Sequence, residues 1–333
     1  MSAALDTLLD STGALASPVT RGILLAVALA LVVAPLAVLG LQAAKKLDTD
    51  TGSDIWRRYF TWLWLTPLII VPIVWCPLSA VLMITAAAIL CYREFARATG
   101  LFRERAISVI VVVGILLLAF AALDRWYGLF VAVTPLVVCA LAIGGILPDR
   151  PKGYLQRISL ATVGFLLFGT GLMHLAFMTV DSLYRPILCT LFVSAQFCDI
   201  AAYCTGKAFG RRKLFPNTSP NKTLGGHLGG LLLTAPLVAW LTHLTFTGTA
   251  IDRPELLITF GLLVAVCAQF GDLILGSIKR DLGVKDLAVT LPGHGGVSDR
   301  FNSLLAVAVV AFHFIQYLVG FGYNSPLRIF TGE

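Results

Sequence analysis

The amino-acid sequence predicts an all-α, polytopic integral membrane protein. Of its 333 residues, 58% are hydrophobic and 13% are charged, and the mean hydropathy is +0.87. Soluble domains contain about 45–50% apolar and about 25% charged residues. The apolar residues also fall in blocks, and a helix needs about 20 of them to cross a bilayer. This composition argues against a soluble domain, a disordered chain and a secreted disulfide scaffold.

The apolar blocks indicate ten membrane-spanning helices. The second and third blocks are short and meet at Cys76-Pro77, so nine spans, with one broken element at that point, is the alternative. The predicted spans cover about 22–44, 60–76, 77–92, 107–123, 129–147, 158–180, 186–206, 224–247, 256–278 and 303–322.

Lys and Arg collect in every second loop between these spans. Five loops hold 20 of the 25 basic residues, and the opposite side holds five. Because basic residues favour the cytoplasmic side, we expect these loops in the cytoplasm and both termini outside, in a bacterial inner or plasma membrane. The same bias explains the net charge of +7, so nucleic acid is not an expected partner. The five loops are 45–59, 93–106, 148–157, 207–223 and 279–302.

The first half of the chain offers little chemistry. Tyr92, Arg93 and Glu94 close the third span, where the ordinary role is a helix-end ion pair or an interfacial anchor. The seven cysteines lie in or beside apolar blocks, which indicates packing rather than disulfides or zinc. No long polar linker divides the chain. We therefore expect one membrane domain over 1–333, with its polar residues concentrated in 195–305.

The seventh span ends in a segment that suits a phosphate. Asp199 lies at membrane depth, where a carboxylate needs a partner or an ion, and a structural ion pair with a nearby Lys or Arg is the alternative. The loop that follows is rich in glycine, serine and lysine. Small residues let backbone N–H groups approach an anion, and lysine neutralises it. We expect an anionic group to be held by Lys222 and the glycines near it, 225, 226, 229 and 230.

A denser polar cluster follows the ninth span. Its aspartates offer the oxygen ligands that Mg²⁺ prefers, and its basic residues can bind phosphate oxygens. The tight turn 292–296 is suited to wrapping a phosphate. A metal-plus-polyphosphate site at the cytoplasmic face explains this cluster better than a solvated loop with offsetting charges. The charged residues are Asp272, Lys279, Arg280, Asp281, Lys285, Asp286, Asp299 and Arg300.

This run resembles the signature of the phosphatidate cytidylyltransferases, or CDP-diacylglycerol synthases. Lys279-Arg280 is followed after four residues by Lys285-Asp286, then by Pro-Gly-His-Gly-Gly and Asp299-Arg300. Residues upstream resemble the same family in order and spacing. The resemblance is strong over about 195–305 and weak before it. The upstream positions are Asp199, Ala202, Tyr203, Gly206, Phe209, Gly210, Lys213, Leu214, Pro216, Ser219, Pro220, Lys222 and Thr223.

The resemblance implies a CTP-dependent reaction of phospholipid biosynthesis. Phosphatidate and CTP would give CDP-diacylglycerol and pyrophosphate, in a helical bundle whose polar cavity opens to the cytoplasm. The expected partners are CTP, phosphatidate or a related lipid phosphate, and the bilayer, with a homodimer as one candidate assembly. Mg²⁺ is the expected cofactor, and a monovalent cation is a second candidate. The alternatives are a nucleotidyltransferase for a prenyl or ether-lipid phosphate, and an inactive paralogue or transporter.

The resemblance also assigns roles to the residues that match it. Asp272 and Asp299 are expected to hold Mg²⁺, with Asp199 and Asp286 in support. The catalytic candidates are Asp272, Lys279, Arg280, Asp286, His294, Asp299 and Arg300. The substrate-binding candidates are Asp199, Tyr203, Lys213, Ser219, Lys222, Thr223, Lys285, Gly293, Gly295 and Gly296.

Five residues, at three places in the chain, depart from the family pattern. Leu224-Gly225 stands where the family has Trp-Glu, Leu275-Gly276 where it has Glu-Ser, and Asn302 where it has Asp. Three carboxylates and one hydroxyl of the pattern are therefore missing. These departures predict a divergent, active member with an altered lipid preference or an altered metal shell.

Overall fold

The computed structural model describes residues 6–44, 49–291, 295–321 and 328–332. Helix makes up 77% of the described residues, and the sheet among them has two short strands. This confirms the prediction of an all-α fold.

Ten helical spans in the described part of the chain are long and apolar enough to cross a membrane, which confirms ten spans rather than nine. The sixth span is continuous but changes from α-helix to π-helix and back. A short 3₁₀ turn, η1 (Leu101–Arg103), separates the third and fourth spans. The spans are α2 (Pro18–Ala43), α3 (Thr49–Trp75), α4 (Pro77–Ala98), α5 (Arg105–Leu123), α6 (Tyr127–Ile146), α7 (Tyr154–Gly164) with η2 (Phe165–Gly171) and α8 (Leu172–Met178), α9 (Tyr184–Phe209), α10 (Leu224–Thr245), α11 (Pro254–Asp281) and α12 (Ser298–Leu318).

The second and third spans are two helices because the chain turns at Cys76. Cys76 has an extended backbone and Pro77 is the first residue of α4, a position where the missing N–H of proline costs nothing. The last carbonyls of α3 then lack helical partners. Arg185 of α9 supplies them, because its guanidinium donates to the carbonyl oxygens of Val74 at 2.8 Å and Trp75 at 3.1 Å.

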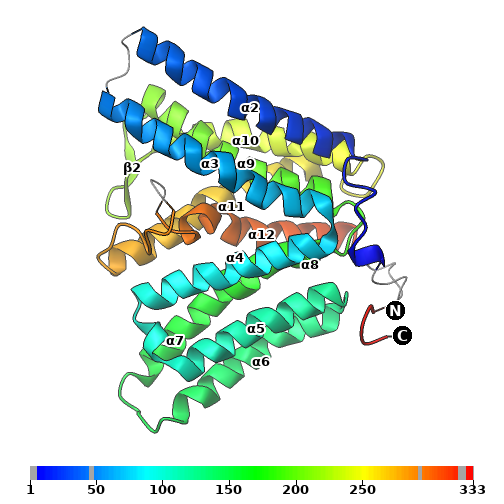
Figure 1. Ribbon diagram of the computed structural model, residues 1–333, viewed down its shortest axis with the longest axis vertical. Coiled ribbons are helices and arrows are strands. Elements are labelled where there is room, and N and C mark those ends of the chain that lie inside the picture. Colours follow the sequence, from blue (N-terminus) through cyan, green and yellow to red (C-terminus); the bar gives the residue numbers. More distant parts are fainter. Residues whose placement is uncertain (1–5, 45–48, 292–294, 322–327, 333) are drawn as a thin grey trace.

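The helices form one bundle with its core along α8 and α12. Figure 1 shows α2, α3 and α10 on one flank and α5 and α6 on the other, with α4 and α12 between them. The fully buried Phe312 of α12 packs against Phe130 of α6 and Phe177 of α8. These aromatic contacts hold α12 in the centre of the bundle.

A β-hairpin connects α9 to α10, where the sequence indicated only a polar loop. Strand β1 (Lys213–Phe215) pairs antiparallel with β2 (Ser219–Thr223), and Lys213 lies opposite Thr223. The Thr223 hydroxyl accepts the backbone N–H of Gly226 at 3.1 Å and so caps the N-terminus of α10. The hairpin thus ends where α10 begins, which fixes the place of Lys222 just before that helix.

The described ends of the chain lie at one end of the bundle, and the hairpin lies at the other (Figure 1). Arg185 donates to the backbone oxygen of Asp10 at 2.6 Å. Near the C-terminus, the backbone N–H of Phe330 donates to Asp124, after the end of α5, at 2.6 Å. The two ends therefore share a face opposite the hairpin, as an even number of spans requires.

Candidate active site

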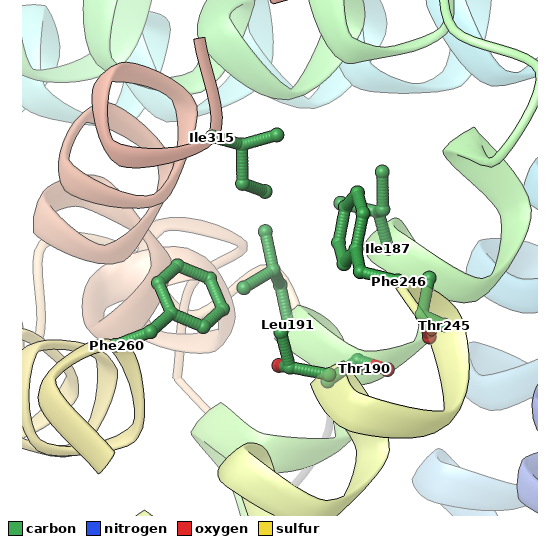
Figure 2. A pocket seen from close by; sticks show the side chains of 8 residues that line it. Ile187, Thr190, Leu191, Thr245, Phe246, Phe260 and Ile315 are labelled. Atoms are coloured by element: carbon green, nitrogen blue, oxygen red, sulfur yellow. The ribbon is translucent and has the colours of Figure 1, made fainter. Parts of the chain in front are cut away.

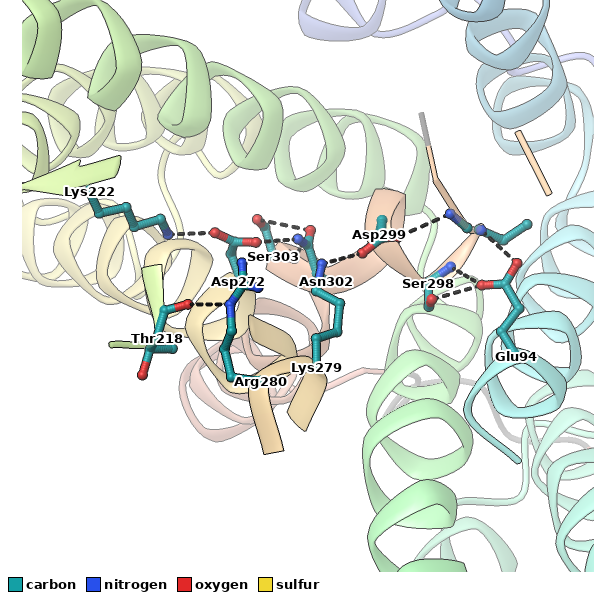
Figure 3. A network of polar contacts seen from close by, with 12 residues as sticks. Glu94, Thr218, Lys222, Asp272, Lys279, Arg280, Ser298, Asp299, Asn302 and Ser303 are labelled. Atoms are coloured by element: carbon teal, nitrogen blue, oxygen red, sulfur yellow. Dashed lines mark hydrogen bonds and ion pairs between the residues drawn. The ribbon is translucent and has the colours of Figure 1, made fainter. Parts of the chain in front are cut away.

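A first polar network joins the hairpin to α11 and α12. The ammonium of Lys222 lies 2.6 Å from Oδ2 of Asp272, and the side-chain amide of Asn302 donates to Oδ1 of the same carboxylate at 2.6 Å. Lys222 also reaches the backbone oxygen of Gln269 at 3.4 Å. Figure 3 shows this line of contacts running from β2 through α11 to α12. Asp272 is therefore held by a cation on one oxygen and by an amide on the other.

Asp199 joins this network from α9. Its Oδ2 accepts the Ser303 hydroxyl at 3.2 Å, and the backbone N–H of Ser303 donates to Oδ1 of Asn302 at 2.7 Å. The negative charge of Asp199 interacts with that of Asp272. Two acidic side chains from different spans thus lie close together inside the membrane domain. This arrangement is costly unless the carboxylates pair with basic side chains or bind a metal ion.

A second network lies at the start of α12. Lys279 of α11 contacts Oδ1 of Asp299 at 2.7 Å, and the Asp299 side chain is only 5% exposed. The other oxygen of Asp299 accepts the backbone N–H of Gly296 at 3.0 Å. A Cβ built on Gly295 would lie 2.7 Å from Asp299 and 3.2 Å from the Asp286 carboxylate. Asp286 and Asp299 therefore flank the same glycine.

Arg300 connects the two networks electrostatically. Its charge interacts with those of Asp299, Asp199 and Asp272. The charge of Arg58, on α3, also acts on Arg300. Arg58 was not among the predicted residues, because it belongs to an ordinary basic loop end in the weakly matching half of the chain.

Glu94 is a second residue beside these networks that was not predicted from the sequence. The expectation of a helix-end ion pair or interfacial anchor differs from the structure: Glu94 is buried and accepts hydrogen bonds from Thr290 and from the first residues of α12. The physical reason is tertiary, since α4 packs beside the start of α12. The available signal was the presence of a carboxylate in an apolar span.

Several predicted site residues lie at the edge of these networks. Arg280 is exposed, and its Nε donates to the Thr218 oxygen of the hairpin at 3.4 Å. Tyr203 is 68% exposed on α9. Lys213 and Lys285 are exposed, and Ser219 is half-buried in β2. These side chains remain predictions as substrate-binding groups.

The glycines after Lys222 have a packing role in the structure. They lie within α10, and a Cβ on Gly226 would come 2.6 Å from the backbone oxygen of Ala202 in α9. A Cβ on Gly225 would come 3.1 Å from the Phe209 oxygen. These glycines let α9 and α10 touch backbone to backbone. This contact accounts for their small size, and their predicted role in binding an anion stays a prediction.

The turn before α12 is described in part. Gly293 and His294, together with Pro292, lie outside the described residues. Gly295 is described and has a φ of +72°, a conformation that suits glycine. The N–H of Gly296 donates to Asp299, so this amide is already used within the protein. For residues 292–294, the predicted binding of a phosphate stays a prediction.

A small cavity lies at the far end of the bundle. Figure 2 shows its lining, which includes Thr190, Phe246, Phe260 and Ile315. Its volume is about 10 Å³, which is the space of about one water molecule. A nucleotide or a lipid phosphate does not fit there, and the polar networks at the hairpin end are the better candidate site.

The chemistry of the donor set fits Mg²⁺. Among the described residues, no three His, Cys, Asp or Glu side chains gather closely enough to hold a metal alone. Mg²⁺ does not require such a cage, because it is usually bound by one or two carboxylates together with substrate phosphates and water. The pair Asp199 and Asp272, with the Asn302 amide beside them, offers oxygen donors of this kind.

Comparisons with known proteins agree with this geometry. The model of the cytidylyltransferase family matches residues 56–318. The chain belongs to this family. The match includes both polar networks, and it also covers most of α3 and all of α4, which carry Arg58 and Glu94.

Curated relatives cover parts of the chain. An uncharacterized protein, YnbB, of Escherichia coli (strain K12) is 36% identical over 204 residues, 57% of this chain and 65% of that protein. A phosphatidate cytidylyltransferase of Staphylococcus haemolyticus is 35% identical over 157 residues, 46% of this chain and 58% of that protein. A phosphatidate cytidylyltransferase of Staphylococcus aureus (strain COL) is 40% identical over 116 residues, which are 35% of this chain and 44% of that protein. The chain thus spans less than two thirds of the length of each of these relatives.

Proposed function

We propose that this protein is a CTP-dependent cytidylyltransferase that converts phosphatidate to CDP-diacylglycerol and pyrophosphate in phospholipid biosynthesis. The observation that carries the proposal is the pair of lysine–carboxylate networks, Lys222–Asp272 and Lys279–Asp299, at one end of a membrane bundle. Relatives named phosphatidate cytidylyltransferase support the same substrate. A site at the end of membrane helices also suits one lipid and one water-soluble substrate.

The reaction needs no covalent enzyme intermediate. An oxygen of the lipid phosphate attacks the α-phosphorus of CTP, a new P–O bond forms, and the bond between the α-phosphorus and the bridging oxygen breaks to release pyrophosphate. Catalysis of such a transfer consists of positioning and of neutralising negative charge. Lys222, Lys279 and Arg300 supply positive charge within the membrane domain for the triphosphate and the lipid phosphate.

Acidic residues position these cations and offer the metal site. Asp272 holds Lys222, and Asp299 holds Lys279. Asp272 and Asp299 are the proposed ligands of Mg²⁺, with Asp199 and Asp286 in support. When bound, Mg²⁺ would neutralise phosphate charge and hold the leaving group.

A nucleotidyltransferase for another lipid phosphate is the second candidate. It is favoured by Asn302, whose amide donates to Asp272 at the position where the resemblance implies a carboxylate. Both candidates place the active loops 207–223 and 279–302 in the cytoplasm, because the basic residues concentrate there.

A panel of lipids tests the two candidates. Purified protein is incubated with labelled CTP, Mg²⁺ and either phosphatidate, an ether-lipid phosphate or a prenyl phosphate, and the liponucleotide and pyrophosphate are measured. Phosphatidate is expected to give the highest rate. A prenyl or ether lipid as the best substrate would favour the second candidate, and no pyrophosphate with any lipid would contradict both.

A further inference from the structure

Glu94 makes more hydrogen bonds to the start of α12 than any residue expected to bind substrate. It comes from α4, about 200 positions earlier in the chain, and it is 6% exposed. Its Oε1 accepts the N–H of Val297 at 2.8 Å and the Thr290 hydroxyl at 2.6 Å. Its Oε2 accepts the N–H of Ser298 at 2.9 Å and the Ser298 hydroxyl at 2.7 Å. One buried carboxylate thus receives four hydrogen bonds.

These bonds fix the backbone from which the proposed active-site residues extend. The first N–H groups of a helix have no partner within it, and a carboxylate at this end is stabilised by the helix dipole and by charge-assisted hydrogen bonds. Val297 and Ser298 directly precede Asp299 and Arg300. Asp299 itself takes the N–H of Gly296. Figure 3 shows Glu94, Ser298, Asp299 and Lys279 in one continuous chain of contacts.

Gly296 makes room for this carboxylate. A Cβ built at Gly296 would collide with Oε2 of Glu94 and lie 2.9 Å from its Cδ. Glycine is therefore required at this position because Glu94 occupies the adjoining space. The amide groups of 296, 297 and 298 all donate to carboxylates of the protein, which leaves this part of the turn without amides for a phosphate.

We propose that Glu94 is a positioning residue of the active site, which holds the first turn of α12 so that Asp299 meets Lys279 and Arg300 meets the substrates in a fixed geometry. This proposal rests on the proposed function, which gives Asp299 and Arg300 their roles. Glu94 acts through the backbone and does not itself contact a substrate.

Amide hydrogen exchange of the substrate-free protein tests the structural part of the proposal. Glu94→Gln keeps the shape of the side chain but removes its charge and turns an N–H₂ group toward the donors. Exchange at Val297 and Ser298 should rise about tenfold, since local opening exposes these amides. The matched control is Glu104→Gln, which changes a glutamate that faces Arg157 at 4.0 Å. Unchanged exchange at Val297 and Ser298 would overturn the proposal.

Steady-state kinetics test the positioning part. A residue that presets catalytic groups should lower kcat about tenfold or more and change the KM for CTP less than about threefold. Glu94→Asp, which keeps the charge, should recover part of the lost rate. A loss confined to KM, or a rate within about twofold of wild type, would contradict the positioning role.

Gly296→Ala, with Glu94 intact, keeps the proposal testable if Glu94→Gln does not fold, because its Cβ should displace the Glu94 carboxylate and raise the exchange of Val297 and Ser298. Gly296→Ala should lower kcat strongly on its own, but much less in a Glu94→Ala background, where the collision is absent and the bonds are already lost. The two effects should therefore be non-additive by about tenfold. Additive effects would overturn the proposal and favour a phosphate-binding turn. If the wild type has no turnover with any lipid phosphate, the proposed function fails, whereas the exchange result still decides the structural role of Glu94.

Discussion

Asp272 has a different partner on each of its two carboxylate oxygens. Lys222 approaches one at 2.6 Å and the Asn302 amide donates to the other. Asp299 is held in the same way by Lys279 and by a backbone N–H. Both aspartates are thus fixed in orientation before any substrate arrives, which is what a preorganised electrostatic site requires.

Loss of either carboxylate charge should abolish activity. Asp272→Asn and Asp299→Asn each remove a proposed Mg²⁺ ligand and leave a lysine without its partner. We expect kcat to fall more than about tenfold, a loss above about 1.4 kcal/mol of transition-state stabilisation. The matched control is Asp149→Asn, at an exposed position with a φ of +49°, where asparagine is well tolerated. A variant that keeps more than about a tenth of the wild-type kcat would lose its proposed metal role.

Restoring the family residues should strengthen the proposed metal site. Gly276→Ser with Asn302→Asp adds one hydroxyl and one carboxylate, and Mg²⁺ prefers such oxygen ligands. Serine fits at 276, because a Cβ there would meet only the Thr218 methyl group, at 3.6 Å. We expect the doubly changed protein to need less Mg²⁺ for half-maximal rate, or to turn over phosphatidate faster.

The measurement is a Mg²⁺ titration of the rate with phosphatidate and with a prenyl phosphate. A lower rate on the preferred lipid would indicate that both positions were changed to suit that lipid. Unchanged rates and an unchanged Mg²⁺ requirement on both lipids would contradict the idea that Gly276 and Asn302 weaken the Mg²⁺ site.

At the scale of elements, the contact between α9 and α10 sets the distance between Asp199 and the hairpin that carries Lys222. The two helices touch through glycines, and any side chain there would push them apart. Gly226→Ala places a Cβ 2.6 Å from the Ala202 oxygen, and such overpacking costs about 1–3 kcal/mol. A melting curve of the purified protein should therefore shift to lower temperature.

The control for this change is Gly22→Ala in α2. Its Cβ would have nothing within 4 Å, and alanine is the better helix former by about 1 kcal/mol. Its melting temperature should be equal to or above that of the wild type. Equal stability of both variants would show that the α9–α10 contact tolerates expansion.

How well the sequence predicts an element depends on whether its cause is local. The ten spans follow from runs of apolar residues, and the proline at 77 marks the boundary between the second and third spans. The meeting of Lys222 with Asp272 was not predicted, because the sequence assigned Lys222 to an anionic group and Asp272 to Mg²⁺. Glu94 and the glycines of α10 could not be placed, because burial and backbone contact arise from helices distant in sequence. The hairpin was missed for a different reason, since β1 has only three residues and β2 is polar and contains a proline.

At the scale of the whole molecule, the orientation in the membrane can be tested by labelling. The basic loops predict that residue 213 faces the cytoplasm and residue 253 faces outside. With Lys213→Cys and Arg253→Cys, an impermeant thiol reagent added to intact cells should label only position 253, and it should reach 213 after the cells are opened. Both side chains are exposed. Labelling of 213 in intact cells would reverse the orientation and move the proposed CTP site outside.

The pairing of each lysine with a carboxylate has a consequence for how substrates enter. Because Lys222 and Lys279 are already paired with carboxylates, neither lysine would be free to receive a phosphate of the proposed reaction. An incoming phosphate would have to take the place of an internal carboxylate, and the carboxylate that it displaces would become available to a divalent cation. In the proposed reaction, substrate binding and opening of the metal site are therefore one ion exchange.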